Sequence, residues 1–223
     1  MPHAAIFDVN ETMLDLGGLD PVFMDMFGDT HARREWFARL LHLSAVTTVL
    51  AGDSDFGSLG GAALEALGVS RGVEIGQAER RALSSAMGRL RAYPDVAPAL
   101  DALRDDGWHP YALTNTPSTG AEEQLTAAGL IDRFEGILSV EAVGRFKPDP
   151  EPYLHAAEVI GSDPAELWMV ACHDWDLAGA AAVGMRTAYV ERLGMTFSSI
   201  YPQPGVRADD MSRLIDLILA TRV

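Results

Sequence analysis

Cysteine is nearly absent from this sequence, and long apolar runs are missing altogether. The one cysteine, Cys172, has no partner for an internal disulfide, which is typical of proteins that fold in a reducing cytosol. No stretch approaches the roughly 18 consecutive apolar residues of a membrane-spanning helix. The N-terminus also has no basic region ahead of an apolar segment, as a signal peptide would. The sequence therefore predicts a soluble cytoplasmic protein with no membrane partner.

Positive charge is scarce as well. There are 17 basic residues against 32 acidic ones, and the formal net charge is −15. Such a surface repels the phosphates of nucleic acids and of anionic lipids, so we expect neither as a partner. Hydrophobic residues make up 48% of the 223 residues and charged residues 22%, as in an ordinary globular protein. This length allows one large domain, or a core with a smaller appendage.

Lysine occurs only once, because 16 of the 17 basic residues are arginine. The single lysine, Lys147, lies in the turn-rich segment RFKPDP, directly after a strand-like run. Arginine is a planar fork that keeps its proton, whereas lysine is a compact point charge on a thin stem. The single lysine therefore indicates a site that requires a compact point charge and not a planar fork.

Two kinds of pattern divide the chain. The run 3–8 is short and apolar and ends in a carboxylate, as a buried strand with Asp8 at its tip would. Residues 15–93 are helical in pattern, with apolar faces separated by loops rich in glycine and aspartate. Beyond residue 94, strand-like runs alternate with helices, the first of which Asp95 is expected to cap. The predicted strands of this part are 111–114, 136–139, 167–171 and 187–190.

Strands that alternate with helices are typical of parallel β-α-β units with helices on both faces of the sheet. The first strand has the same character, although the helical stretch separates it from the others. The sequence therefore predicts an α/β fold: a doubly wound, Rossmann-like parallel-sheet core with an inserted α-helical cap. The expected core domain consists of residues 1–14 and 94–223, and the expected cap domain of residues 15–93.

Polar residues gather where the predicted strands end. They come from four separate segments, and the carboxyl ends of parallel strands meet at one edge of a sheet, where ligands bind. Taken singly, each segment could equally be a helix cap, a turn or a surface residue. Together they predict one site. The segments are 8–12 (DVNET), 114–116 (TNT), Lys147, and 172–176 (CHDWD).

The same segments resemble the four motifs of the haloacid dehalogenase superfamily, in the order DVNET, LTN, KPDP and HDWDLAGA. Order and spacing match over essentially the whole chain, including a helical cap between the first and second motifs. Most members of that superfamily are phosphatases. These carry a second aspartate two residues after the nucleophile, and an aspartate in the last motif that binds magnesium.

This chain departs from the phosphatase pattern at both positions. Asn10 replaces the second aspartate, and an amide cannot supply a proton at neutral pH. Cys172 stands where the metal-binding aspartate is expected, and a neutral thiol is a poor ligand for Mg²⁺. Asp174 and Asp176 lie nearby, so metal binding stays open. The two departures favour a reaction that requires no metal or other cofactor.

The chain is more similar to the type II 2-haloacid dehalogenases. Like that branch, it has a tyrosine, Tyr153, six residues after Lys147, and the pair Trp175 and Asp176 in the last motif. The resemblance implies a metal-independent hydrolase that releases halide from short 2-haloacids through an aspartyl ester. A carboxylate is ionised at pH 7, and halide leaves without a proton, so the groups that this chain lacks are not needed.

The resemblance also implies roles for the site residues. Asp8 is expected to attack C2 of the substrate, while Thr12, Thr114 and Lys147 keep its carboxylate ionised and oriented. Asp176, alone or with His173, is expected to position the water that opens the ester. The residues expected to contact the substrate are Asn10, Thr114, Asn115, Tyr153, Arg34 and Phe37.

The cap leaves a question open. Members of this branch have an arginine directly after a tryptophan in the first cap helix, but here Phe37 follows Trp36. Arg33 or Arg34, one turn earlier, could reach the same face, and Arg34 is the expected substrate contact. The expected partner is a small anionic substrate, and a homodimer is a further possibility. A magnesium-dependent phosphatase and an idle homologue that binds a small acid remain alternative functions.

Overall fold

A parallel sheet of six strands forms the centre of the computed structural model, which describes residues 3–192, 194 and 196–221. The strand order is β5-β4-β1-β6-β7-β8, and every neighbouring pair is parallel. The predicted strands are confirmed. The short last strand was not predicted, because three residues carry too little pattern. The strands are β1 (Ala4–Phe7), β4 (His109–Thr114), β5 (Gly136–Ser139), β6 (Trp168–Ala171), β7 (Arg186–Val190) and β8 (Val206–Ala208).

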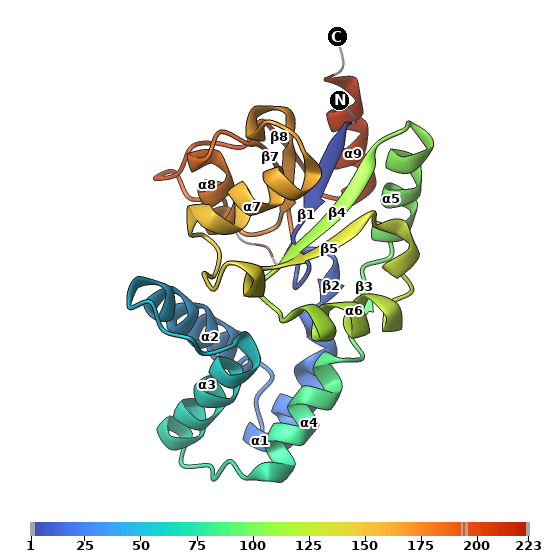
Figure 1. Cartoon of the computed structure of the whole chain (residues 1–223). Helices are drawn as coiled ribbons and strands as arrows, with labels where there is room; N and C mark the ends of the chain where they lie inside the picture. Colours follow the sequence, from blue (N-terminus) through green and yellow to red (C-terminus); the bar gives the residue numbers. More distant parts are fainter. Residues whose placement is uncertain (1–2, 193, 195, 222–223) are drawn as a thin grey trace.

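Helices cover both faces of this sheet (Figure 1). Successive side chains of a strand point to opposite faces, so Phe7 packs in the cluster that includes α5 and α9, and Ile6 packs in the cluster that includes α7 and α8. The doubly wound α/β core is therefore confirmed. Its helices are α5 (Val96–Asp105), α6 (Ser118–Ala127), α7 (Pro150–Ile160), α8 (Asp174–Ala182) and α9 (Met211–Ala220), with short 3₁₀ turns at Ile131–Arg133, Val140–Ala142 and Pro164–Glu166.

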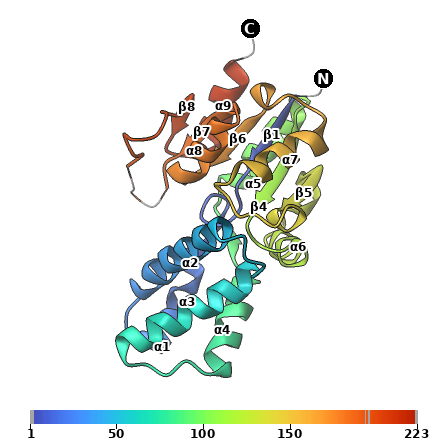
Figure 2. The ribbon, with the colours of Figure 1, turned by 60° about the vertical axis from the view of Figure 1, so that its left-hand side comes forward.

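The inserted segment folds into a helical cap beyond the carboxyl ends of the strands (Figures 1 and 2). One hydrophobic cluster runs without interruption from Phe7 in the sheet to Trp36 and Leu64 in the cap. Within the described residues, no helix combines the length and apolarity needed to cross a membrane. The cap consists of a 3₁₀ turn at Leu16–Leu19 and the helices α1 (Asp20–Phe27), α2 (Ala32–Val49), α3 (Phe56–Arg71) and α4 (Gln77–Met87).

The two chain segments that join cap and core pair with each other. They form a two-stranded antiparallel ribbon of β2 (Leu14–Asp15) and β3 (Arg91–Ala92). The strand β2 begins two residues after the DVNET segment (8–12). The ribbon therefore fixes the point at which this segment leaves the main sheet.

Two local expectations were wrong. Asp95 does not cap α5 with its side chain; its carboxylate accepts hydrogen bonds from Arg192 and from the backbone amide of Met211, at the start of α9. The apolar pattern of residues 177–183 predicts a helix that starts at Leu177, but in the structure this helix begins at Asp174. The second difference matters for function, because it places Asp174 and Asp176 in the first turn of α8, beside the carboxyl end of β6.

Candidate active site

Asp8 lies just past the end of β1, and its backbone amide still donates to the Val170 carbonyl oxygen of β6 (3.0 Å). The chain then turns tightly, because the amides of Met13 and Leu14 both donate back to the carbonyl oxygen of Val9. This turn brings the Thr12 hydroxyl to 2.7 Å from Asp8 Oδ2, to which it donates. The side chain of Asp8 is thereby held in one orientation in a buried site.

Lys147 reaches the same carboxylate from the segment before α7. Its Nζ donates to Asp8 Oδ1 (2.7 Å), to Asp176 Oδ2 (2.6 Å) and to the Leu113 carbonyl oxygen (3.0 Å). These three bonds use every donor of an ammonium group, and the side chain is fully buried. A guanidinium could not converge on three acceptors around one point. The structure thus gives a physical reason for the single lysine.

The charges of this cluster are set by burial and by one another. Burial raises the pKa of Asp8, but the adjacent Lys147 ammonium and the bond from His173 lower it well below its usual range. Burial lowers the pKa of Lys147, whereas Asp176 and Asp8 raise it. The pKa of Asp176 is raised, first by burial and then by the charge of Asp8, against the opposing effect of Lys147. Asp8 is therefore ionised at neutral pH.

Tyr153 is fully buried and contacts Asp176 of this cluster. Its hydroxyl donates to Asp176 Oδ1 (2.6 Å) and lies 3.0 Å from the Asp176 carbonyl oxygen. Burial and the Asp176 charge raise its pKa well above the usual value, so it remains a donor. Gly179 leaves room for this contact, since a Cβ there would lie 2.7 Å from the tyrosine oxygen. We expected a substrate contact, but the geometry makes Tyr153 a support for Asp176.

His173 lies between two carboxylates. Its Nδ1 is 3.1 Å from Asp8 Oδ2, and its Nε2 is 3.0 Å from Glu11 Oε2. Burial alone lowers its pKa, but the Cys172 sulfur and the carboxylates of Asp8 and Glu11 raise it well above the usual value. Each ring nitrogen thus lies within hydrogen-bond distance of a carboxylate, an arrangement that favours the protonated imidazole.

Glu11 is the functional residue that sequence reasoning missed. It is buried, at 6% exposure, and its backbone has a positive φ of 63°, an uncommon conformation for a residue other than glycine. Its Oε1 is 3.4 Å from Nη1 of Arg33 in cap helix α2. In the sequence, the one sign of its role was its position as a charged residue inside the DVNET motif.

The cap presents Arg33 to the site, not Arg34. Arg33 is buried at 6% exposure, and its Nε donates to Asp20 Oδ1 at 2.6 Å. Arg34 is exposed, because one residue along an α-helix rotates the side chain by about 100°. Phe37 packs against the site, with its ring centroid 6.2 Å from that of His173, and its contact with the substrate stays a prediction.

The remaining candidates hold the loops around the carboxylate. Asn10 Nδ2 donates to the Thr116 hydroxyl oxygen (3.2 Å), while Asn10 Oδ1 is buried with no hydrogen-bond partner among the described residues. The Thr114 hydroxyl oxygen accepts from the Thr116 amide (3.1 Å), and among the described residues no hydrogen bond joins Thr114 to Asp8, as we had expected one to do. Asn115 Oδ1 accepts from the backbone amide of Lys147 (3.0 Å) and positions that lysine.

The residues present do not fit a magnesium ion. Over the described part of the chain, no group of three or more His, Cys, Asp or Glu side chains is placed to hold a metal. Asp174 turns its oxygens to the backbone amides of Trp175 and Ser198. Cys172 is buried and offers a thiol in place of an oxygen ligand. The charge between Asp8 and Asp176 is supplied by the Lys147 ammonium.

Known proteins resemble this chain in three comparisons: with a family sequence model, with single sequences and with solved structures. The sequence model of the haloacid dehalogenase-like hydrolases matches residues 2–184. (S)-2-haloacid dehalogenase 4A of Burkholderia cepacia is 30% identical over 194 residues, which cover 86% of this chain and 84% of that protein. A phosphatase of Mycobacterium tuberculosis is 35% identical over 132 residues, which cover 57% of this chain and 60% of that protein.

The third comparison is with a solved structure. The L-2-haloacid dehalogenase of Xanthobacter autotrophicus, with chloropropionic acid covalently bound, has a TM-score of 0.91. The similarity covers 99% of this chain and 100% of that one, at 24% identity, and it shows the shared fold. Since the family's sequence model matches most of the chain, from the first strand to the end of the last motif, this protein belongs to the haloacid dehalogenase-like hydrolases.

Proposed function

We propose that this hydrolase is a metal-independent dehalogenase of 2-haloacids, with short acids as its simplest substrates. The observation that carries the proposal is the Asp8 carboxylate, which is ionised and held by Lys147 and Thr12 at 2.7 Å each. Such a carboxylate can displace halide from an sp³ carbon without a metal or a proton donor. The similarity to (S)-2-haloacid dehalogenase 4A supports this choice of substrate.

In the first step, Asp8 attacks C2 of the substrate, a C–O bond forms, and halide leaves with the electrons of the carbon–halogen bond. Lys147 keeps its bond to Oδ1, which becomes the carbonyl oxygen of the ester. The charge of Asp8 disappears in this step. His173 therefore loses one of the two carboxylates that raise its pKa, and it can release its proton to solvent.

In the second step, neutral His173 takes a proton from the water that attacks the Asp8 carbonyl carbon. Glu11, 3.0 Å from Nε2, stabilises the imidazolium that forms, and Lys147 stabilises the oxyanion on Oδ1. When the intermediate collapses, the bond between Cγ and the former Oδ2 of Asp8 breaks, and this oxygen leaves as the product alcohol with the proton from His173. The new carboxyl group of Asp8 then passes its own proton to His173, which restores the carboxylate and the imidazolium of the resting site. Asp176 is a poorer base, because both of its oxygens accept hydrogen bonds, from Lys147 and Tyr153.

Halide release from 2-bromopropionate with EDTA present tests the proposed reaction. After a single turnover in ¹⁸O-water, mass spectrometry should find the label in the peptide that contains Asp8, and Asp8→Asn should release no halide. Glu166→Gln, an exposed substitution in a 3₁₀ turn of the core, is the control.

The similarity to the mycobacterial phosphatase supports a second candidate, a magnesium-dependent phosphatase for a small phosphate ester. Phosphate release that needs Mg²⁺, with no halide release from any short 2-haloacid, would favour this candidate. Tight binding of a small carboxylate without turnover of either class would indicate the idle homologue.

A further inference from the structure

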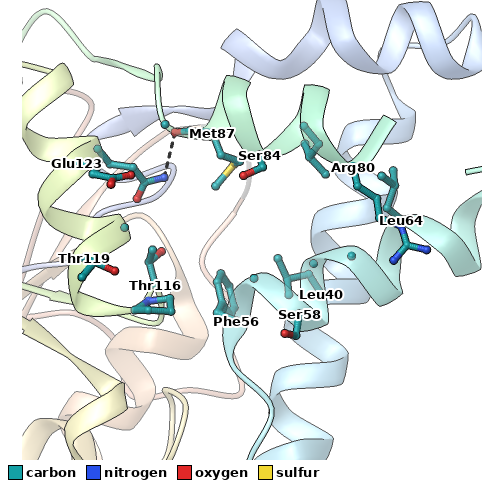
Figure 3. A pocket seen from close by; sticks show the side chains of 18 of the residues that line it. Leu40, Phe56, Ser58, Leu64, Arg80, Ser84, Met87, Thr116, Thr119 and Glu123 are labelled. Carbon is teal, nitrogen blue, oxygen red and sulfur yellow. Dashed lines mark hydrogen bonds between the residues drawn. The ribbon is translucent and has the colours of Figure 1, made fainter. Parts of the chain in front are cut away.

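A cavity of about 700 Å³ lies between the cap and the core (Figure 3), and Asp8, Lys147 and His173 are not among the residues that line it. Figure 3 shows Leu40 and Phe56 of the cap on one side of the open space and Thr116 of the core on the other. Cavities of this size hold drug-sized ligands. The six non-hydrogen atoms of a 2-halopropionate need roughly 180 Å³, at about 30 Å³ each. The cavity is much larger than such a substrate.

Glycines of α3 shape the cap side of this cavity. Gly57, Gly60, Gly61 and Leu64 all line it, and their spacing places them on one helix face. Glycine inside a helix destabilises it relative to alanine, so a packing reason would be expected. There is none at Gly61, where an added Cβ would have no atom within 4 Å, and at Gly60 the nearest would be Trp36 at an ordinary 3.6 Å. These glycines keep the face open.

Two residues of the cavity wall are connected to residues of the catalytic site. Thr116 lines it, and its hydroxyl oxygen accepts from Asn10, two residues after Asp8 in the chain. Trp36 lines it too, and the adjacent Phe37 packs against His173.

One buried acceptor belongs to the cavity wall. Gln124 lines the cavity and is 3% exposed. Its Nε2 donates to the Met87 carbonyl oxygen, whereas its Oε1 has no hydrogen-bond partner among the described residues. Around it, Leu40, Phe56 and Leu83 offer hydrocarbon surface.

We infer that this cavity receives the substituent on C2 of the substrate. The preferred substrates are then 2-haloacids with an apolar chain longer than a methyl group. The inference rests on the proposed function and names its substrate class. Each methylene that moves from water into the cavity should raise kcat/KM by up to about fourfold, which corresponds to about 0.8 kcal/mol.

The test compares 2-bromohexanoate with 2-bromopropionate by halide release. In the wild-type protein, kcat/KM should be at least about tenfold higher for the longer acid, which has three more methylenes. Gly61→Phe fills the cavity from its open face, and should lower the ratio of the two kcat/KM values at least about tenfold. Ala62→Phe adds the same side chain to the next residue, which is exposed and outside the cavity, and should leave the ratio unchanged.

Two results overturn the inference while the proposed function stands. They are hydrolysis of 2-bromopropionate with no preference for the longer acid, and a Gly61→Phe variant that keeps the wild-type ratio. If neither acid releases halide, the proposed function fails, and calorimetry with unhalogenated hexanoate and propionate decides about the cavity. Tighter binding of hexanoate that Gly61→Phe abolishes supports the assignment of the cavity to the side chain of the acid, and equal binding of the two acids refutes it.

Discussion

At the scale of single residues, the site distributes two positive groups among three carboxylates. Lys147 joins Asp8 to Asp176, and His173 joins Asp8 to Glu11. Buried charges are tolerated only when they are paired and hydrogen-bonded, and these are. Asp8 belongs to both pairs, so loss of its charge on ester formation affects both cations. Lys147 retains Asp176, and His173 retains Glu11.

This arrangement predicts the effect of Glu11→Gln on the pH profile. The Glu11 charge favours protonated His173, so its removal lowers the pKa of His173. Because ester hydrolysis needs the neutral imidazole, its rate rises with pH through that pKa, and the rise should move to lower pH in the variant. The plateau should fall about 10- to 100-fold, since the imidazolium loses its counter-ion.

The measurement is ester hydrolysis under single-turnover conditions from pH 5 to 9. Glu166→Gln should keep the wild-type profile. An unshifted profile in Glu11→Gln would contradict the role given to the Glu11–His173 pair.

At the scale of elements, Arg192 ties the first motif to the second cap linker. Its Nε donates to the carbonyl oxygen of Thr12 (2.8 Å), and its Nη2 donates to the carboxylate of Asp95 (2.9 Å). Its guanidinium also lies 3.9 Å from the ring centroid of Tyr93. A side chain that follows β7 thus fixes the DVNET loop, the linker after β3 and, through Asp95, the start of α9.

We predict that Arg192→Leu lowers the free energy of unfolding by about 1–3 kcal/mol, because Asp95 and the Thr12 carbonyl group lose a partly buried partner. Arg192→Lys should lose less, since a point charge can still reach Asp95. Urea denaturation measures both variants. Arg213→Leu, on the exposed side of α9, is the control and should change stability by less than about 0.5 kcal/mol. An equal loss in the control would show that the bonds of Arg192 contribute nothing specific.

At the scale of the whole molecule, the net charge of −15 opposes an anionic substrate. Exposed charges are screened by salt, whereas the buried pairs at the site are screened much less. The overall repulsion therefore acts on the approach of the substrate more than on its chemistry.

Salt should consequently raise kcat/KM for 2-bromopropionate while kcat stays constant. Between about 0.01 and 0.15 M ionic strength the Debye length falls from about 30 to about 8 Å, and we expect kcat/KM to increase at least twofold. An uncharged 2-bromopropionamide, followed by the same halide assay, is the matched control substrate. A decrease of kcat/KM with salt for the acid would show that local positive charge governs its approach instead.

The sequence by itself determined the sheet, the insertion of the cap and the edge at which the site lies. Short apolar runs that alternate with helical patterns predict parallel strands. Parallel strands bring their carboxyl ends together at one edge of the sheet, wherever they lie in the chain. Asp8, Thr12, Lys147 and Asp176 could therefore be assigned to one site from motif positions alone. Their contacts follow from positions next to strand ends, where the backbone leaves little freedom.

The tertiary structure decided everything that depends on the rotation of a helix or on a partner far away in the chain. Arg33 enters the site and Arg34 does not, because the docking angle of α2 selects between neighbours about 100° apart. Glu11 acquires a role only when His173 and Arg33 approach it from another strand and from the cap. The Tyr153 hydroxyl donates to Asp176 and the Thr114 hydroxyl accepts from the Thr116 amide, and neither contact is written in the local sequence. Local pattern carries no information about such pairings, since packing over the whole chain sets them.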